Sequence, residues 1–431
     1  MRPFRNFSPH DLLDNDWYKF TMQFAMFSNG LADTNVSFKF KDRKGAVKAF
    51  LTSHPSIPLN QVKEELAGIL NAYAALQFDE RDIDFVVQEL KKAVVAGKDT
   101  LLESYKSRMM AAARSVSIDL SLSKEDGLGL EYSGSWFDTI LFEVPFLAII
   151  SEYFNNYQPT PPSDESIRES IRDKMAQYTQ SNAQVIEFGT RRRFSRHVHE
   201  IVFDAIVHEI GTAALTSNVL LSKQRGSSPK GTCAHEWFMF YEAAHRTSNL
   251  QVTRAGTISS LQKSLQDWLS VYSSIFALTD VFRTNTFFDA YALLSSELQA
   301  RVQFRCDSGN ELDYCGWIQD GFEKVYGKAL LPAHALNKSI MFSNSLSPKK
   351  VAEIQAWHAA HAAKSGETQF SFIYGVGTNF TNDLQYDTLD IVIKIHRVED
   401  KFAFKLSDVG SKFVGAEELK GPVHNAFADV A

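Results

Sequence analysis

The sequence predicts an α/β protein whose larger part is a β/α barrel, and two patterns support this fold class. From residue 183 onward, short apolar, β-prone runs end in polar or glycine residues, at 184–188, 276–278, 301–304, 339–342 and 370–374. Helix-like stretches separate several of these runs, whereas strands near the two ends of the chain alternate apolar and polar residues instead. Continuous apolar runs are typical of buried parallel strands, and a ring of such strands forms a barrel. An open doubly wound sheet is the alternative, because it also places ligands at the carboxyl ends of its strands.

The same patterns divide the 431 residues into three segments. We expect an N-terminal α/β domain at 1–140, a β/α barrel at 141–384, and a C-terminal segment at 385–431 that returns to the N-terminal domain. In the first segment, residues 34–41 alternate as a half-buried strand, and helical periodicity predicts helices around 62–73 and 81–94. In the last segment, residues 389–396 and 401–405 are predicted to form an antiparallel pair.

Composition excludes several classes of function. The net charge is -6, which gives no general basic face for nucleic acid. The most apolar stretch, 140–150, contains Glu143 and Pro145 and is too short to cross a bilayer. The three cysteines are too few for a disulfide framework and lack metal-site spacing. We therefore expect a cytoplasmic protein that acts on small molecules, with no nucleic-acid partner and no membrane segment.

Two predicted strand ends carry groups suited to a phosphorylated sugar. In segment 375–378, glycines let the backbone approach an anion and Thr378 adds a hydroxyl donor. A plain tight turn is an equally good interpretation of that segment alone. Segment 305–309 offers an arginine for anionic oxygens and an aspartate for ribose hydroxyls or magnesium. A surface ion pair is the alternative there.

Two further segments contain candidate binding groups. In segment 187–193, Arg191 or a neighbouring arginine could bind a carboxylate or phosphate, and Phe188 could stack on a flat ring. The alternative is a solvated basic turn. His235 lies between a small residue and an acidic one and could act as a base, metal ligand or phosphoryl acceptor, although a lone histidine is more often structural.

Eight segments together resemble the nicotinate phosphoribosyltransferase family, in the order in which the family has them. They are 12–22, 133–140, 187–193, 216–218, 231–237, 277–280, 305–309 and 375–383. The resemblance implies an irregular barrel of the type II phosphoribosyltransferase kind, with an N-terminal domain completed by the C-terminal segment. It also implies a homodimer with shared active sites, and ATP-coupled, Mg²⁺-dependent transfer of phosphoribosyl from phosphoribosyl diphosphate to nicotinate. The products would be nicotinate mononucleotide and diphosphate, in NAD biosynthesis.

The resemblance assigns roles to the expected catalytic residues. His235 matches the histidine that takes phosphate from ATP and becomes phosphohistidine, and Asp280 matches the carboxylate that orients it. Arg305 matches an arginine at the sugar diphosphate. The resemblance also implies that Asp307 faces the ribose and its magnesium ion.

The resemblance also implies how the pyridine ring is held. Phe188 and, from the partner subunit, Tyr18 match the aromatic pair that sandwiches the ring, and Arg191 matches an arginine beside the nicotinate. The other expected substrate-binding residues are Thr190, Ser217, Asn218, Ser308, Gly309, Gly375, Gly377 and Thr378.

Three positions depart from the family pattern. Leu215 stands where a glycine is usual, and Asn310 and Asn344 stand where aspartate is common. The two asparagines remove negative charge near the expected metal or phosphoryl site, which bears on the strength of ATP coupling.

Two alternative functions remain at this stage. The first is transfer to nicotinamide, whose enzymes carry an aspartate where Ser217 stands. The second is a catalytically silent, nucleotide-binding relative. The joint presence of His235, Asp280, Arg305 and Asp307 argues against it, because a purely structural barrel needs none of them.

Overall fold

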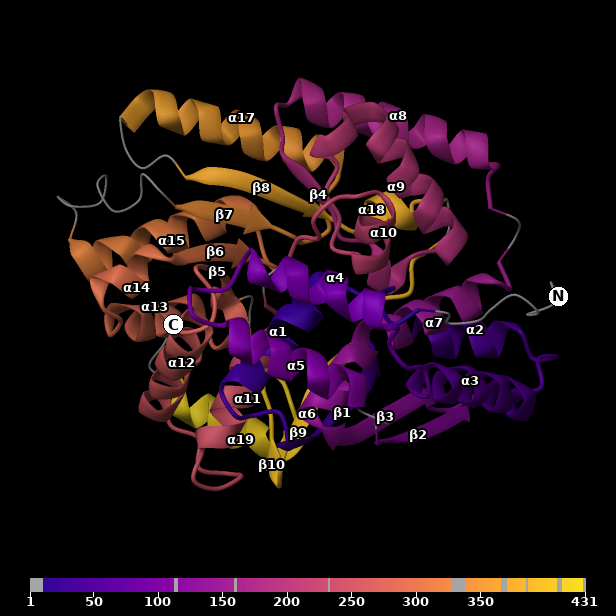
Figure 1. The fold of residues 1–431 in the computed structure, drawn as a ribbon, viewed down its shortest axis with the longest axis horizontal. Coiled ribbons are helices and arrows are strands. Elements are labelled where there is room, and N and C mark those ends of the chain that lie inside the picture. Colours follow the sequence, from indigo (N-terminus) through magenta and orange to yellow (C-terminus); the bar gives the residue numbers. More distant parts are fainter. Residues whose placement is uncertain are drawn as a thin grey trace.

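The computed structural model describes residues 11–111, 115–158, 161–231, 233–327, 338–365, 370–384, 387–408 and 413–428, without the side chains of 361–365. The described chain forms a mixed α/β fold built around two five-stranded sheets (Figure 1).

The first sheet is antiparallel and joins strands from the two ends of the chain, in the order β10-β9-β1-β3-β2. Its strands are β1 (Asn35–Asp42), β2 (Val116–Ser123), β3 (Gly127–Ser135), β9 (Ile391–Val398) and β10 (Lys401–Phe402). β9 pairs with β1 along most of its length, so the last part of the chain lies beside the first (Figure 1). The alternating segment expected at 34–41 forms β1.

The helices outside the parallel-strand region are mostly amphipathic. They are α1 (Trp17–Ser28), α2 (Ala46–Ser53), α3 (Leu59–Ala74), α4 (Glu80–Lys91), α5 (Asp99–Ala111), α6 (Trp136–Thr139), α7 (Glu143–Asn155) and α19 (Glu417–Ala426). α3 and α4 match the two helices predicted from periodicity. Helix α7 is buried along most of its length and packs against α3 and β9.

The second sheet is parallel, in the order β4-β8-β7-β6-β5. Its strands are β4 (Val185–Glu187), β5 (Ile275–Leu278), β6 (Val302–Cys306), β7 (Ser339–Phe342) and β8 (Ser371–Val376). They coincide with the five apolar runs of the sequence, so the expectation of parallel strands is confirmed. Among the described residues, β4 and β5 are the two edge strands and no ladder joins them.

Helices alternate with these strands and cover the sheet (Figure 1). They are α8 (Asp164–Gln180), α9 (Arg196–Ile210), α10 (Val219–Gln224), α11 (His235–His245), α12 (Arg254–Leu269), α13 (Thr284–Ala292), α14 (Ser296–Ala300), α15 (Glu311–Tyr326), α17 (Pro348–Ser365) and α18 (Thr378–Thr381). Ser163 caps α8 by accepting a hydrogen bond from the backbone N–H of Ser166. In the part of the chain that the structure describes, no helix has the length and apolar character needed to cross a membrane.

Aromatic side chains fill much of the interior. On the helix-covered side of the parallel sheet, Phe304 packs against Phe287, Phe288 and Phe322 with ring centroids 5.5–6.3 Å apart. Under the antiparallel sheet, Phe38 stacks on Tyr132 at 5.0 Å. Offset-stacked and edge-to-face contacts of this kind fix the relative positions of the strands that carry the site.

The C-terminal segment departs from its expected course. Residues 401–405 do not form one strand: β10 ends at Phe402, and Lys405–Leu406 (β11) pairs instead with Phe413–Val414 (β12). Arg246 donates to the carbonyl oxygen of Phe402, and Phe404 packs edge-on against Phe282 at 5.0 Å. These contacts draw the chain out of the sheet and carry β11 to the end of β5.

Candidate active site

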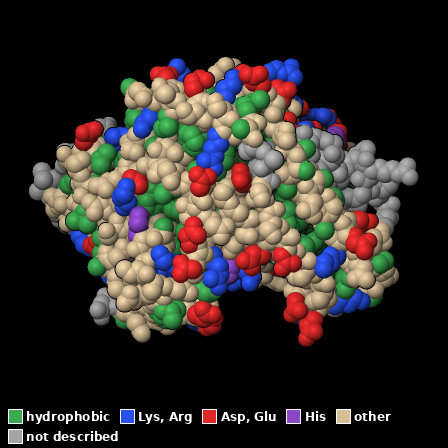
Figure 2. All heavy atoms as spheres, turned by 60° about the horizontal axis from the view of Figure 1, so that its bottom comes forward, with side chains coloured by type: hydrophobic (Ala, Val, Ile, Leu, Met, Phe, Trp, Pro, Cys, Tyr) green, Lys and Arg blue, Asp and Glu red, His purple; other side chains and the backbone are tan. Residues whose placement is uncertain are grey.

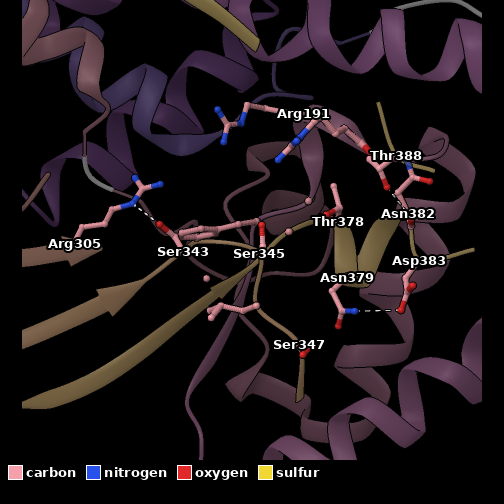
Figure 3. A pocket seen from close by; sticks show the side chains of 16 residues that line it. Arg191, Arg305, Ser343, Ser345, Ser347, Thr378, Asn379, Asn382, Asp383 and Thr388 are labelled. Atoms are coloured by element: carbon pink, nitrogen blue, oxygen red, sulfur yellow. Dashed lines mark hydrogen bonds between the residues drawn. The ribbon is translucent and has the colours of Figure 1, made fainter. Parts of the chain in front are cut away.

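A cavity of about 260 Å³ opens where β4, β6, β7 and β8 end (Figure 3). Parallel strands place their carboxyl ends at one edge of a sheet, which is where open α/β folds bind ligands. The cavity brings together several of the predicted site residues, and it is also lined by others that the sequence did not single out. The first group is Phe188, Arg191, Arg305, Gly375, Gly377 and Thr378, and the second includes Arg192, Ser343, Ser345, Ser347, Asn379, Asn382, Asp383 and Thr388.

The ring of Phe188 forms part of the cavity wall and depends on the glycine at 375. A methyl group on Gly375 would overlap the Phe188 ring, and one on Gly377 would lie 3.3 Å from the Phe188 carbonyl oxygen. Neither glycine has a positive φ. Gly375 is therefore required for the placement of Phe188, and not only for close approach of an anion as the sequence suggested.

Arg305 is one of the residues that line the cavity. Its guanidinium carbon lies 6.0 Å from the centre of the Phe188 ring, its Nε donates to Ser343 Oγ at 2.9 Å (Figure 3), and a terminal nitrogen donates to Asp307 Oδ1 at 3.1 Å. Ser343 Oγ also lies 2.9 Å from Asp307 Oδ1. The Arg305 side chain is thus fixed from two sides, and one oxygen of Asp307 is already used.

His235 and Asp280 form a second cluster next to the cavity. His235 Nε2 lies 2.9 Å from Asp280 Oδ1, as the resemblance requires of a histidine oriented by a carboxylate. The other oxygen of Asp280 accepts from Ser308 Oγ and from Lys405 Nζ, both at 2.6 Å. Asp307 Oδ2 is 3.9 Å from His235 Nδ1, so Asp307 lies between this cluster and Arg305.

Burial sets the charge state of this cluster. Burial, followed by the positive charge of Lys405, lowers the pKa of His235 to about 4. Burial opposes ionisation of Asp280, but His235 and Lys405 together hold its pKa well below the usual range. At neutral pH His235 is therefore a neutral imidazole with one unprotonated ring nitrogen, which is the form that can attack a phosphorus atom.

A magnesium ion would have a single evident ligand from this cluster. In the described residues no group of three or more His, Cys, Asp or Glu side chains is arranged to hold a metal ion. Burial opposes ionisation of Asp307, yet Arg305 lowers its pKa to about 2, so Asp307 is a carboxylate with one oxygen free of hydrogen bonds to Arg305 and Ser343. Magnesium commonly takes one or two protein carboxylates together with substrate phosphates, so Asp307 fits that limited role.

Thr190, Ser217 and Asn218 do not line the cavity. They are buried and contact the segment that precedes α1: Ser217 Oγ donates to Asp16 Oδ1 at 2.8 Å, and Asn218 Nδ2 donates to Asp14 Oδ1 at 2.8 Å. The Ser217 hydroxyl is therefore committed to a carboxylate of the chain. The resemblance implies that Ser217 binds substrate, but its hydroxyl already has this partner within the chain.

Tyr18 lies near Arg191 of its own chain, and Arg191 lines the cavity. Its hydroxyl is buried, and burial together with the negative charge of Glu143 raises its pKa well above the usual value, while Arg191 opposes that rise. Arg191 of the same chain is thus close enough to influence the pKa of Tyr18.

Lys405 and Ser343 are two of the site residues that the sequence did not single out. Lys405 lies 170 residues from His235, in a segment expected to belong to the N-terminal sheet, and Ser343 carries no motif. The apolar run 339–342 did place Ser343 at a strand end, which was the available signal.

The two asparagines that depart from the family pattern have structural roles. Asn310 caps α15 by accepting from the backbone N–H groups of Leu312 and Asp313, which aspartate would do equally well. Asn344 donates to the carbonyl oxygen of Gly309, a residue with φ of 88° that turns β6 toward α15. An aspartate could not make that donation.

Comparisons with known proteins identify the family of this chain. Residues 13–151 match the model of the nicotinate phosphoribosyltransferase N-terminal domain, and residues 183–429 match that of the nicotinate phosphoribosyltransferase family. The chain is 31% identical to nicotinate phosphoribosyltransferase from Chromohalobacter salexigens over 95% of both chains. It is 30% identical to that from Ralstonia nicotianae over 93% of this chain and 94% of the relative.

Solved structures show the same likeness. The crystal structure of nicotinate phosphoribosyltransferase from Porphyromonas gingivalis superposes with a TM-score of 0.79 at 26% identity, over 97% of this chain and 99% of that one. The fold is that of a solved transferase. The chain belongs to the nicotinate phosphoribosyltransferase family.

Proposed function

We propose that the protein transfers phosphoribosyl from phosphoribosyl diphosphate to nicotinate, forming nicotinate mononucleotide and diphosphate for NAD biosynthesis. One observation carries the proposal: an aromatic wall and two arginines, Phe188, Arg191 and Arg305, surround a cavity that adjoins the His235–Asp280 cluster. The protein's three cysteines are buried and form no disulfide, which suits the cytoplasm as its location.

The transfer itself needs orientation and charge more than acid–base chemistry. Loss of diphosphate from C1 builds positive charge on the ribose, and Arg305, which lines the cavity, would stabilise the negative charge of the leaving group. Phe188 would hold the flat pyridine ring so that its nitrogen faces C1. No general base is required, because the pyridine nitrogen is unprotonated at neutral pH.

Thr378, with the backbone at Gly377, would bind the phosphate of the sugar. Thr378 lines the cavity opposite Arg305 (Figure 3) and stands at the end of β8. The neighbouring hydroxyls of Ser345 and Ser347 add donors that are compatible with an anionic oxygen.

We further propose that ATP phosphorylates His235 and that magnesium accompanies the diphosphate. A neutral His235 oriented by Asp280 is a competent nucleophile, and Asp307 would supply one oxygen to magnesium. Magnesium would neutralise the charge that develops on the diphosphate. Asp307 lies between His235 and Arg305. It would therefore connect the phosphorylation of His235 with the transfer of phosphoribosyl.

An irregular barrel closed by short bridges belongs to the same proposal. Glu187 of β4 makes a parallel bridge with Thr216, whose carbonyl oxygen accepts from Lys230 N at 2.9 Å. Cys233 Sγ then lies 3.7 Å from the carbonyl oxygen of Phe276 in β5. These contacts lead from one edge strand to the other without a regular ladder, which suits the type II phosphoribosyltransferase architecture.

Nicotinate is favoured over nicotinamide because the cavity presents cations to the ring substituent. Arg191 lines the cavity and pairs well with a carboxylate, whereas a neutral amide gains less from it. A homodimer with shared sites remains part of the proposal, although Tyr18 already lies near Arg191 of its own chain.

The proposal is tested by product formation. Purified protein is mixed with phosphoribosyl diphosphate, Mg²⁺ and nicotinate, with and without ATP, and the mononucleotide and ADP are quantified by chromatography. We expect mononucleotide in both mixtures and more complete conversion with ATP. No mononucleotide under either condition would instead favour the silent, nucleotide-binding alternative.

A further inference from the structure

A buried group of charged side chains adjoins Arg191 but lies outside the cavity lining. Lys19 of α1 lies between two carboxylates, 2.5 Å from Glu143 Oε2 and 2.5 Å from Glu236 Oε2. The exposed fraction of the Lys19 side chain is 0%, and those of the two glutamates are 8% and 5%. Trp136 Nε1 donates to the other oxygen of Glu236 at 2.6 Å. Lys19 is therefore held by two buried carboxylates, Glu143 and Glu236, from which water is excluded.

Glu143 is shared unequally between two cations. Its Oε2 is in direct contact with Lys19, whereas its Oε1 lies 3.5 Å from a terminal nitrogen of Arg191. Arg191 is also the only one of the two cations that reaches the cavity among the described residues, and its side chain is 35% exposed. Glu143 therefore contacts the buried Lys19 more closely than it contacts Arg191, which lines the cavity.

The consequence follows from the geometry of arginine–carboxylate pairs. A guanidinium and a carboxylate bind best through two parallel hydrogen bonds, and such a pair is strong when water is excluded. Without Lys19, both oxygens of Glu143 would be free to take Arg191 in that way. Arg191 would then be neutralised inside the protein before a substrate carboxylate arrived.

We propose that Lys19 is a positioning residue for carboxylate recognition: by holding Glu143, it keeps Arg191 available to the carboxylate of an aromatic substrate. This deepens the proposed function and rests on it, because it presumes that nicotinate binds beside Arg191. Lys19 itself does not touch the substrate. Its effect is exerted through Glu143 on the affinity for the ring acid.

The neighbouring Glu236 provides a matched control. Like Glu143 it contacts Lys19 at 2.5 Å and is buried, but no ion pair joins it to Arg191 in the described structure. Removing the charge of either glutamate takes one charged partner from Lys19. Only removal of the Glu143 charge should change what Arg191 can bind.

The test is a set of five variants: Lys19→Met, Glu143→Gln, Glu236→Gln, and the two double variants that combine Lys19→Met with each glutamine. The KM for nicotinate, the KM for phosphoribosyl diphosphate and kcat are measured for each, with thermal unfolding as a check on folding. We expect Lys19→Met to raise the KM for nicotinate roughly tenfold or more, the equivalent of losing one good charged contact, with smaller changes in the other two constants.

The two double variants show whether Lys19 acts through Glu143. Adding Glu143→Gln to Lys19→Met should return the KM for nicotinate to within about threefold of wild type, whereas adding Glu236→Gln should not. An unchanged KM in Lys19→Met, or equal rescue by both glutamines, would overturn the proposal. If Lys19→Met does not fold, Glu143→Gln alone decides: the KM for nicotinate should fall or stay level, and a rise would show that Glu143 aids binding.

Failure of this inference is distinguishable from failure of the proposed function. Wild-type protein that makes no mononucleotide rejects the function itself. Wild-type protein that turns over nicotinate, combined with variants that fail the rescue pattern, rejects only the role of Lys19.

Discussion

Replacing Ser217 with aspartate tests how strongly a second buried carboxylate near Arg191 would repel Asp16 and destabilise the fold. Ser217 Oγ donates to Asp16 Oδ1 at 2.8 Å, and both side chains are buried. Ser217→Asp would place a second carboxylate about 3 Å from the first. At an effective dielectric constant of about 20, two such charges repel by roughly 5 kcal/mol. That is a large fraction of the stability of an ordinary domain.

The pH dependence of this variant has a defined sign. Burial already raises the pKa of Asp16, and a second carboxylate would raise it further. A carboxyl group whose pKa is higher in the folded state stabilises the fold below its unfolded pKa and loses that contribution as pH rises through the folded pKa. The free energy of unfolding of Ser217→Asp should therefore fall, relative to wild type, between pH 5 and pH 8.

Chemical denaturation of wild type, Ser217→Asp and the double variant Asp16→Asn/Ser217→Asp, at pH 5 and pH 8, measures this effect. The double variant should recover most of the loss because one charge is gone. An equal loss at both pH values, or no recovery in the double variant, would refute the electrostatic reasoning. Turnover of nicotinate should also fall in Ser217→Asp, since the added carboxylate would compete for Arg191, which is coupled to Asp16.

Three further predictions concern the site and its assembly. Radiolabel from γ-labelled ATP should attach to the protein, be lost in acid and kept in base, and be absent from His235→Ala; labelling of that variant at the wild-type level would exclude phosphorylation of His235. Gly375→Ala should lower stability by about 1–3 kcal/mol and raise the KM for nicotinate, because the methyl group displaces the Phe188 ring; wild-type melting and kinetics would show that the ring has room. Inactive Tyr18→Ala and Arg305→Ala proteins, mixed and allowed to exchange subunits, should regain part of the activity if sites are shared, and exchange without recovery would assign each site to one chain.

Periodicity predicted most of the strands and helices because it depends only on local sequence. The five apolar runs became the parallel sheet, and residues 34–41 became β1. Residues 401–405 were predicted wrongly as one strand, since the turn after Phe402 depends on Arg246 and Phe282, which are distant in the sequence. Local alternation could not reveal those contacts.

The sequence predicted the site residues that follow strands, and it predicted fewer of the others. Phe188, Arg191, Arg305 and Thr378 line one cavity, as their positions after strands suggested. Lys405 was missed because the chain returns to His235 from the opposite sheet. The resemblance lists Ser217 among the substrate-binding residues, but its partner in the structure, Asp16, depends on the packing of the segment before α1.

The charge distribution fits a small anionic substrate held inside the molecule. On the face shown in Figure 2, acidic and basic side chains are interspersed and form no extended basic surface. The arginines that matter to the proposal, Arg191 and Arg305, line the cavity instead. Low local dielectric there strengthens their pairing with carboxylate and phosphate groups.

The most direct measurement of the central claim is a competition for one site. Equimolar nicotinate and nicotinamide are offered to the wild-type protein with limiting phosphoribosyl diphosphate, ATP and Mg²⁺, and the two mononucleotides are separated and counted. Because Arg191 presents positive charge to the ring substituent, nicotinate mononucleotide should exceed the amide product by roughly tenfold or more, the value of one good charged contact. Equal amounts of the two products, or an excess of nicotinamide mononucleotide, would contradict the account.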